Sequence, residues 1–173
     1  MPVWACVGEK RLAHIERVTS LLRAWGAAMR LPADEARAWV DAGMWHDSLR
    51  DAPEEELREI TGDQTSLEGL LHGPAAAIRL EQEGEKRKAV LDAVRFHTVG
   101  SPNWESTGRA LYMADYLEPG RKFSKEDRFF LASQVPHSFD AVFRQVVRFR
   151  LDWAVREGNT IFPETVALWN SLR

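Results

Sequence analysis

Hydrophobic residues recur at steps of three and four along nearly the whole 173-residue chain, which is the spacing of one face of an α-helix. Near the N-terminus, Ile15, Val18 and Leu22 follow this spacing and predict a helix over residues 9–30, which Pro32 ends. No stretch alternates between apolar and polar residues with the period of two that a half-buried strand requires. The pattern therefore predicts an all-α protein.

Helix start and stop signals divide the rest of the chain. Asp51 is placed as an N-cap, Ser124 with Asp127 resembles a capping box, and Pro119 follows the end of a helix. The sequence contains no internal repeat, low-complexity tract or linker, which favours a single domain over residues 1–173. The further helices are expected over residues 34–47, 51–62, 72–84, 86–97 and 106–117, after 124, through 139–153, and from 163 onward.

The composition points to a globular protein and excludes several classes. The 45% hydrophobic and 28% charged residues are ordinary for such a domain. The formal net charge of -3 provides no diffuse basic field for nucleic acid. Cys6 is the single cysteine, so no internal disulfide forms, and no apolar run has the length of a signal peptide or a membrane span. We therefore expect a cytoplasmic protein that binds neither nucleic acid nor membrane.

Four of the five histidines join two aspartates in one ordered series of potential metal ligands. Each lies at helical spacing from apolar residues of its own segment and is therefore expected on a buried face. A single inward histidine is more often a hydrogen-bonded core residue than a ligand, but an ionised carboxylate in an apolar interior needs a partner or a metal. The set as a whole therefore predicts metal binding. Its members are His14, His46, Asp47, His72, His97 and Asp115.

The ligand types narrow the choice of metal. Without a set of thiolates, this is not a structural zinc site. Imidazole mixed with carboxylate suits iron, manganese, cobalt, nickel or zinc. Six protein ligands exceed what one open catalytic ion needs, so two divalent ions sharing a carboxylate are inferred. A pair of ions about 3.5–4 Å apart can bind a bridging hydroxide and clamp a phosphoryl group, which predicts a binuclear phosphohydrolase.

Five segments of the chain resemble the HD superfamily of metal-dependent phosphohydrolases. The resemblance is closer to its YqeK-like branch, the symmetrical bis(5'-nucleosyl)-tetraphosphate hydrolases, and it runs over most of the chain. The five segments are RLAHIERV (11–18), HD (46–47), LHGP (71–74), AVRFHTVG (93–100) and ADYLEPGR (114–121). The last two together are the most specific, and IFPETV (161–166) is a weaker match near the C-terminus.

The resemblance implies a helical bundle with two metals, usually iron, that cleaves diadenosine tetraphosphate into two ADP. It also implies a division of the ligands, in which one ion is held by His14, His46, Asp47 and Asp115, and the other by His72 and His97 with Asp47 bridging both. Within this scheme we expect in-line attack on phosphorus by a hydroxide that bridges the ions, with Asp47, His72 and His97 as catalytic residues.

A polyphosphate substrate also needs cations beyond the metals. Arg50, Arg95 and Arg121 each lie within a few residues of a predicted ligand and are expected to bind phosphate, the alternative being surface salt bridges. Thr98 is expected to donate to a phosphate oxygen or to cap the helix ending at His97.

Three features depart from the family pattern and leave alternatives open. Arg50 stands where the family usually has lysine, Trp45 is an unfamiliar neighbour of the His-Asp pair, and the loop over residues 101–108 is longer than expected. The same ligands also suit hydrolysis of mononucleotides or another phosphoester, a di-iron HD-type oxygenase, or a nucleotide sensor without turnover. A cyclic-dinucleotide phosphodiesterase is disfavoured because its Gly-Tyr-Pro signature is missing. The long apolar C-terminal helix allows either internal packing or a homodimer surface.

Overall fold

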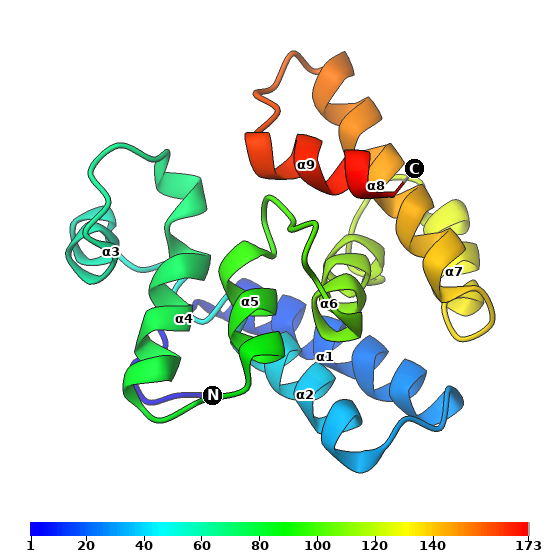
Figure 1. The fold of residues 1–173 in the computed structure, drawn as a ribbon, viewed down its shortest axis with the longest axis horizontal. Coiled ribbons are helices and arrows are strands. Elements are labelled where there is room, and N and C mark those ends of the chain that lie inside the picture. Colours follow the sequence, from blue (N-terminus) through cyan, green and yellow to red (C-terminus); the bar gives the residue numbers. More distant parts are fainter. Residues whose placement is uncertain (173) are drawn as a thin grey trace.

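In the computed structural model, residues 1–172 form nine α-helices and one short 3-10 helix, and no strand occurs among them (Figure 1). The all-α prediction is therefore confirmed. Within this range, no helix combines the length and apolar character needed to cross a membrane. The helices are α1 (Glu9–Ala28), α2 (Ala33–Trp45), α3 (Glu54–Thr61), η1 (Glu68–Leu70), α4 (His72–Gln82), α5 (Lys88–Phe96), α6 (Ser106–Leu117), α7 (Lys125–Gln134), α8 (Phe139–Arg156) and α9 (Pro163–Ser171).

Several helix ends differ from the sequence predictions by a few residues, and three differences concern the site or a predicted cap. Helix α2 ends at Trp45, so the His-Asp pair lies in the turn that follows and not in the last helical turn. Asp51 does not cap α3; its carboxylate instead accepts a hydrogen bond from the backbone N–H of Gly8, at 2.8 Å. Ser124 precedes α7 but makes no capping hydrogen bond through its side chain. Asp51 therefore joins the start of the chain to the turn after α2, where a helix cap was expected.

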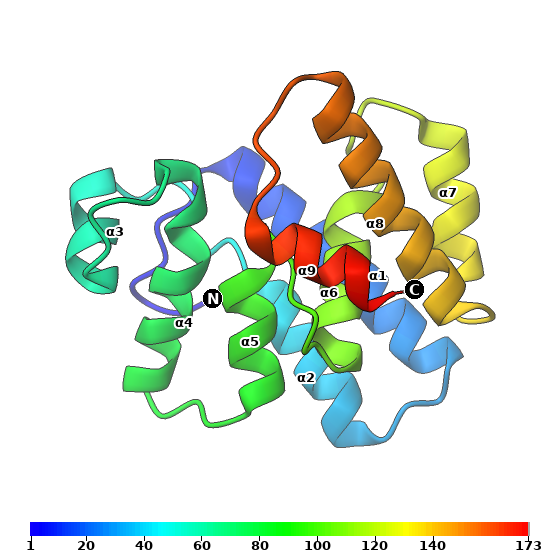
Figure 2. The ribbon, with the colours of Figure 1, turned by 45° about the horizontal axis from the view of Figure 1, so that its top comes forward.

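Helix α6 occupies the centre of the bundle. It packs against α1, α2 and α5 on one side and against α7 and α8 on the other. Figures 1 and 2 show α3 at one end of the molecule and the pair α7–α8 at the opposite end. Because α6 is surrounded, its Leu111, Met113 and Ala114 are fully buried, on more than one face of the helix.

The buried apolar residues form two clusters. The larger one surrounds α6 and includes Trp39, Leu111 and Phe143. The smaller one lies among α3, α4 and α5 and includes Leu71 and Leu80. The candidate site lies where the helices of the two clusters meet, so side chains from both halves of the bundle reach it.

Small residues allow α4 to approach α5 closely. Ala75, Ala76 and Ala77 are fully buried on α4. At Gly73, an added Cβ would lie 2.9 Å from the carbonyl oxygen of Val94, which is closer than such atoms normally approach. This close contact at the start of α4 brings the preceding residue, His72, against the end of α5.

Candidate metal centre

Six buried side chains from five helical segments converge in the middle of the fold. These are the six residues predicted from the sequence: His14 on α1, His46 and Asp47 after α2, His72 at the start of α4, His97 after α5, and Asp115 on α6. Their potential ligand atoms form two triads, each with its atoms within 4.8 Å of one another. The triads are His14, His46 and Asp115, and Asp47, His72 and His97.

Hydrogen bonds set the orientation of three of the four imidazole rings. The Nδ1 atoms of His46 and His97 lie 2.8 and 2.7 Å from the carbonyl oxygen three residues earlier in each case. Because a carbonyl oxygen only accepts, Nδ1 carries the proton and Nε2 has a free lone pair. In His14, Nδ1 lies 3.2 Å from a carboxylate oxygen of Glu118, so the neutral ring carries its proton on Nδ1. Burial lowers the pKa of this ring, but the carboxylates of Asp115 and Glu118 raise it above its ordinary value, so without a metal the protonated ring directs a second N–H, on Nε2, at Asp115. The Nε2 of His46 is buried and has no hydrogen-bond partner.

The second triad contains two imidazoles in direct contact. The Nε2 atoms of His72 and His97 are 3.0 Å apart. Burial lowers the pKa of His72 to about 4, and the positive charge of Arg50 contributes to this shift. The ring is therefore neutral at pH 7, and its buried Nδ1 has no hydrogen-bond partner. Two imidazoles whose nitrogens face one another at this distance are typical of a site that accepts a cation between them.

Asp47 spans the two triads. Its Oδ1 lies 3.1 Å from Nε2 of His72 and 3.3 Å from Nε2 of His97. Its Oδ2 lies 3.5 Å from Nε2 of His46 and 3.7 Å from Nε2 of His14. Burial raises the pKa of Asp47, but the surrounding histidines lower it more, and the net pKa lies well below the ordinary value. The carboxylate is therefore ionised, with one oxygen available to each triad.

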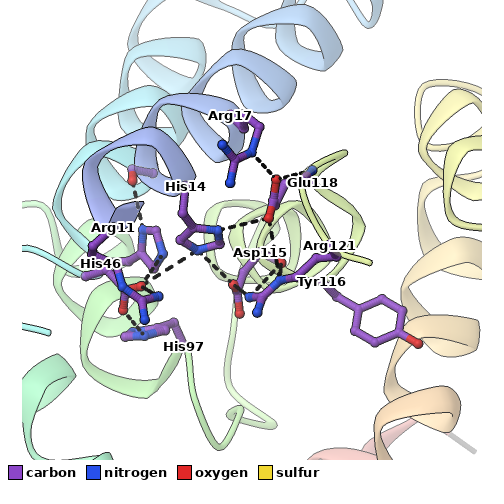
Figure 3. A network of polar contacts seen from close by, with 12 residues as sticks. Arg11, His14, Arg17, His46, His97, Asp115, Tyr116, Glu118 and Arg121 are labelled. Atoms are coloured by element: carbon purple, nitrogen blue, oxygen red, sulfur yellow. Dashed lines mark hydrogen bonds and ion pairs between the residues drawn. The ribbon is translucent and has the colours of Figure 1, made fainter. Parts of the chain in front are cut away.

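Asp115 is the carboxylate of the first triad and is contacted by two arginines, Arg150 and Arg121, of which Figure 3 shows Arg121. Its Oδ1 lies 3.2 Å from Nε2 of His14 and accepts a 2.5 Å hydrogen bond from Arg121. Its Oδ2 lies 3.5 Å from the guanidinium of Arg150. Burial raises the pKa of Asp115, but the bond to His14 and the charges of both arginines lower it well below the ordinary value.

Glu118 lies behind His14, on the side away from the other ligands (Figure 3). Its carboxylate is 1% exposed and accepts hydrogen bonds from Arg17 and from the backbone N–H of Gly120, the latter at 2.6 Å. An added Cβ at Gly120 would overlap the guanidinium of Arg17, so a larger residue there would displace Arg17 from Glu118. Burial raises the pKa of Glu118, but the bonds to His14 and Arg17 lower it to about 2. Glu118 is thus an ionised acceptor that orients the His14 ring.

The four residues predicted to bind substrate lie at different distances from this centre. The Oγ1 of Thr98 is 3.3 Å from Nε2 of His97, and Arg121 contacts Asp115. Arg50 acts on His72 through its charge. Arg95, by contrast, is directed at Glu81 on α4, 4.0 Å away. Of these four residues, Thr98 and Arg121 directly contact the six converging residues.

Two further arginines at the site were not identified from the sequence. Arg11 donates a 2.7 Å hydrogen bond to Oδ2 of Asp47. It lies three residues before His14 on α1, a spacing that could have indicated a shared face. Arg150 comes from α8, far along the chain from the motifs. Its only signal is its position three residues after the buried Val147 on an otherwise apolar stripe.

The residues present fit a metal. Four imidazoles and two carboxylates are a donor set suited to divalent transition metals. In three of the four imidazoles, Nδ1 faces outward onto a carbonyl or carboxylate oxygen, and Nε2 faces the interior of the site. Three buried ring nitrogens of the site, Nε2 of His14, Nε2 of His46 and Nδ1 of His72, have no hydrogen-bond partner, which is unusual in a protein core, where polar atoms find partners. An ion between the inward nitrogens would account for the two Nε2 atoms.

Comparison with proteins of known name finds several relatives, although no protein-family model matches the chain. The symmetrical bis(5'-nucleosyl)-tetraphosphatase of Bacillus subtilis is 28% identical over 178 residues, covering 97% of this chain and 94% of that protein. The enzyme of the same name from Halalkalibacterium halodurans is 27% identical over 148 residues, covering 81% of this chain and 78% of that protein.

A longer relative and a solved structure extend the comparison. A probable nicotinate-nucleotide adenylyltransferase/Ap4A hydrolase of Mycoplasma genitalium is 32% identical over 124 residues, which are 68% of this chain and 35% of that protein. The crystal structure of a predicted HD superfamily hydrolase involved in NAD metabolism, from Clostridium acetobutylicum, superposes with a TM-score of 0.81. It is 26% identical, and the match covers 96% of this chain and 90% of that one.

Proposed function

We propose that this chain, an HD-superfamily hydrolase, cleaves a nucleotide phosphoanhydride, and that its substrate is diadenosine tetraphosphate, cut symmetrically into two ADP. The resemblance predicted from five sequence segments is confirmed by relatives that are named as hydrolases and by the shared fold. Two of those relatives are named symmetrical bis(5'-nucleosyl)-tetraphosphatases, and the first matches this chain over 94% of its own length. The substrate proposal follows from those names.

The observation that carries the proposal is the position of Asp47 between two triads of inward-facing donors. One ion would be held by His14, His46, Asp115 and Oδ2 of Asp47, and the other by His72, His97 and Oδ1 of Asp47. A site with two ions is typical of enzymes that hydrolyse phosphate esters and anhydrides. Iron is the metal that the family resemblance favours, while manganese, cobalt and nickel suit the same donors.

Divalent ions bound there would lower the pKa of water and offset negative charge on the phosphoryl oxygens. The protein's own task is to position and neutralise the polyphosphate. Arg121 and Arg150 contact Asp115, and Arg11 contacts Asp47. Guanidinium groups bind phosphate oxygens in bidentate geometry, so these three arginines are the cations best placed to hold the bridging phosphates.

Thr98 and the histidines of the second triad complete the proposed machinery. The Thr98 hydroxyl beside His97 is free to donate to a phosphoryl oxygen, since its contact with Nε2 of His97 is long, at 3.3 Å. Asp47, His72 and His97 are assigned as the catalytic residues because their potential ligand atoms lie within 3.0–3.3 Å of one another. Arg50 is assigned to phosphate binding on the His72 side, with support from its charge effect there. Arg95 has the weakest support, because its contact is with Glu81.

Chromatographic product analysis tests the proposal. Iron- or manganese-loaded protein is incubated with diadenosine tetraphosphate, and ADP as the sole product is the expected result. Asp47→Asn is expected to abolish turnover, whereas Asp34→Asn, at an exposed position of α2, serves as the matched control and should retain it. ATP together with AMP would contradict symmetrical cleavage. No turnover by metal-loaded protein would reject this substrate and direct the assay to mononucleotides and other phosphoesters.

A further inference from the structure

A cleft of about 1310 Å³ opens on the Asp115 side of the candidate metal centre. Its walls come from α6, α7, α8 and the segment that joins α8 to α9. Asp115, one of the six converging residues, lines the cleft. Thr98 and Arg121 also line it and contact His97 and Asp115, so the cleft and the metal centre are continuous. The volume exceeds the roughly 300–1,000 Å³ usual for small-molecule sites, which leaves room for a large ligand.

The end of the cleft next to the metal centre is positively charged. Arg150 is stacked on the ring of Tyr112, with its guanidinium 4.1 Å from the ring centroid, and it donates to the carbonyl oxygen of Thr98. Arg121 and Arg150 both contact the carboxylate of Asp115, and Arg121 also lies 3.7 Å from Oε1 of Glu118, which is itself paired with Arg17. Three arginines on two carboxylates leave net positive charge where an anionic group of a ligand would meet them.

Farther from the metal centre the lining becomes aromatic. Trp153 lies three residues after Arg150 on α8, hence on the same face, and its side chain is 55% exposed where it lines the cleft. Tyr116 extends from α6 away from the histidines and toward α8 (Figure 3). Phe162, in the segment before α9, also lines the cleft. Exposed tryptophan in a cleft is typical of a surface on which a flat ring stacks.

We propose that this cleft is the nucleoside subsite, in which Arg150 binds a phosphate next to the metal centre and Trp153 stacks on the base. The proposal rests on the proposed function, in which a nucleotide phosphoanhydride is cleaved. A nucleotide matches the two ends of the cleft: its anionic phosphates suit the positively charged end, and its flat base suits the aromatic end. Asp152 also lines the cleft but lies 3.6 Å from Arg148, so it does not reverse the charge of the phosphate end.

The test compares the binding of ADP and of inorganic pyrophosphate to the full-length, manganese-loaded protein by calorimetry. Trp153→Ala should weaken ADP binding about tenfold, since loss of one stacked base typically costs that much or more, and should change pyrophosphate binding less than twofold. Trp153→Phe should restore most of the ADP affinity. Arg150→Met should weaken the binding of both ADP and pyrophosphate. Phe129→Ala is the matched control, because Phe129 is a 77% exposed aromatic residue on α7 outside the cleft, and it should alter neither.

Four outcomes would overturn the proposed subsite. Wild-type protein fails to bind ADP, or Trp153→Ala leaves the ADP affinity unchanged. Alternatively, Trp153→Ala weakens pyrophosphate binding as much as ADP binding, or Phe129→Ala weakens ADP binding as much as Trp153→Ala does. Wild-type turnover of diadenosine tetraphosphate is measured separately. Symmetrical turnover with a Trp153→Ala variant that binds ADP normally would refute the subsite and leave the function intact. ADP binding that depends on Trp153, without turnover, would support the subsite and refute the substrate. Because Trp153 is exposed, its replacement is not expected to unfold the chain.

Discussion

Replacing Glu118 by glutamine tests whether the environment of His14 prepares the metal centre. The native carboxylate accepts from the Nδ1 of His14 through one oxygen and from Arg17 and the Gly120 N–H through the other. Glutamine has the same shape but a single acceptor. The amide oxygen is expected to stay with the two donors, Arg17 and Gly120, which turns the amide NH₂ toward His14.

Two N–H groups then face each other, and the imidazole is driven to the tautomer with its proton on Nε2. That proton occupies the lone pair directed at Asp115 and Asp47 in the native site. Loss of such a supporting hydrogen bond typically lowers metal affinity about 10- to 100-fold, or about 1.4–2.8 kcal/mol. Without metal, the loss of one charge-assisted hydrogen bond should lower the free energy of unfolding by about 1–3 kcal/mol.

The assay is competition between the protein and a chelator for manganese, combined with thermal unfolding with and without metal. At saturating metal, the stabilisation that the ion provides should shrink by the same 1.4–2.8 kcal/mol or so, because stabilisation follows the logarithm of affinity. Glu16→Gln, at an exposed position of the same helix as His14, is the control. A Glu118→Gln protein that binds manganese within twofold of wild type would refute the reasoning, even if its metal-free form were less stable.

Three other perturbations probe the same structure. Asp47→Asn should reduce bound metal to one ion or less per chain by elemental analysis, because one carboxylate serves both triads; full occupancy of two would contradict the bridging role. Gly73→Ala should lower the free energy of unfolding by about 1–3 kcal/mol in urea titrations, since the new methyl lies 2.9 Å from the carbonyl oxygen of Val94 and 3.0 Å from that of Arg95. An unchanged denaturation midpoint would show that α4 moves freely. Removal of metal by a chelator should lower the melting temperature and return of manganese should restore it, whereas a melting temperature insensitive to both treatments would argue against a bound ion.

The helices and the buried faces could be read from the sequence because both depend on local spacing. Helix α6 begins and ends at the predicted residues, since the loop before it and Pro119 after it are strong local signals. The end of α2 could not be predicted in the same way. Trp45, His46 and Asp47 continue the apolar period, but the chain turns at Trp45 to carry the His-Asp pair into the site. Tertiary packing overrides the local pattern there.

The sequence by itself identified all six side chains, and helical periodicity accounts for the burial of His14 and Asp115, which lie within α1 and α6. Only the tertiary structure decided how they meet. The two oxygens of Asp47 divide between the triads, and Glu118 orients His14 across 104 residues of chain. Arg150 reaches Asp115 from a helix outside the sequence motifs, and the cleft exists because α8 and α9 pack beside α6. Distances between helices depend on long-range contacts, and a local pattern carries no information about them.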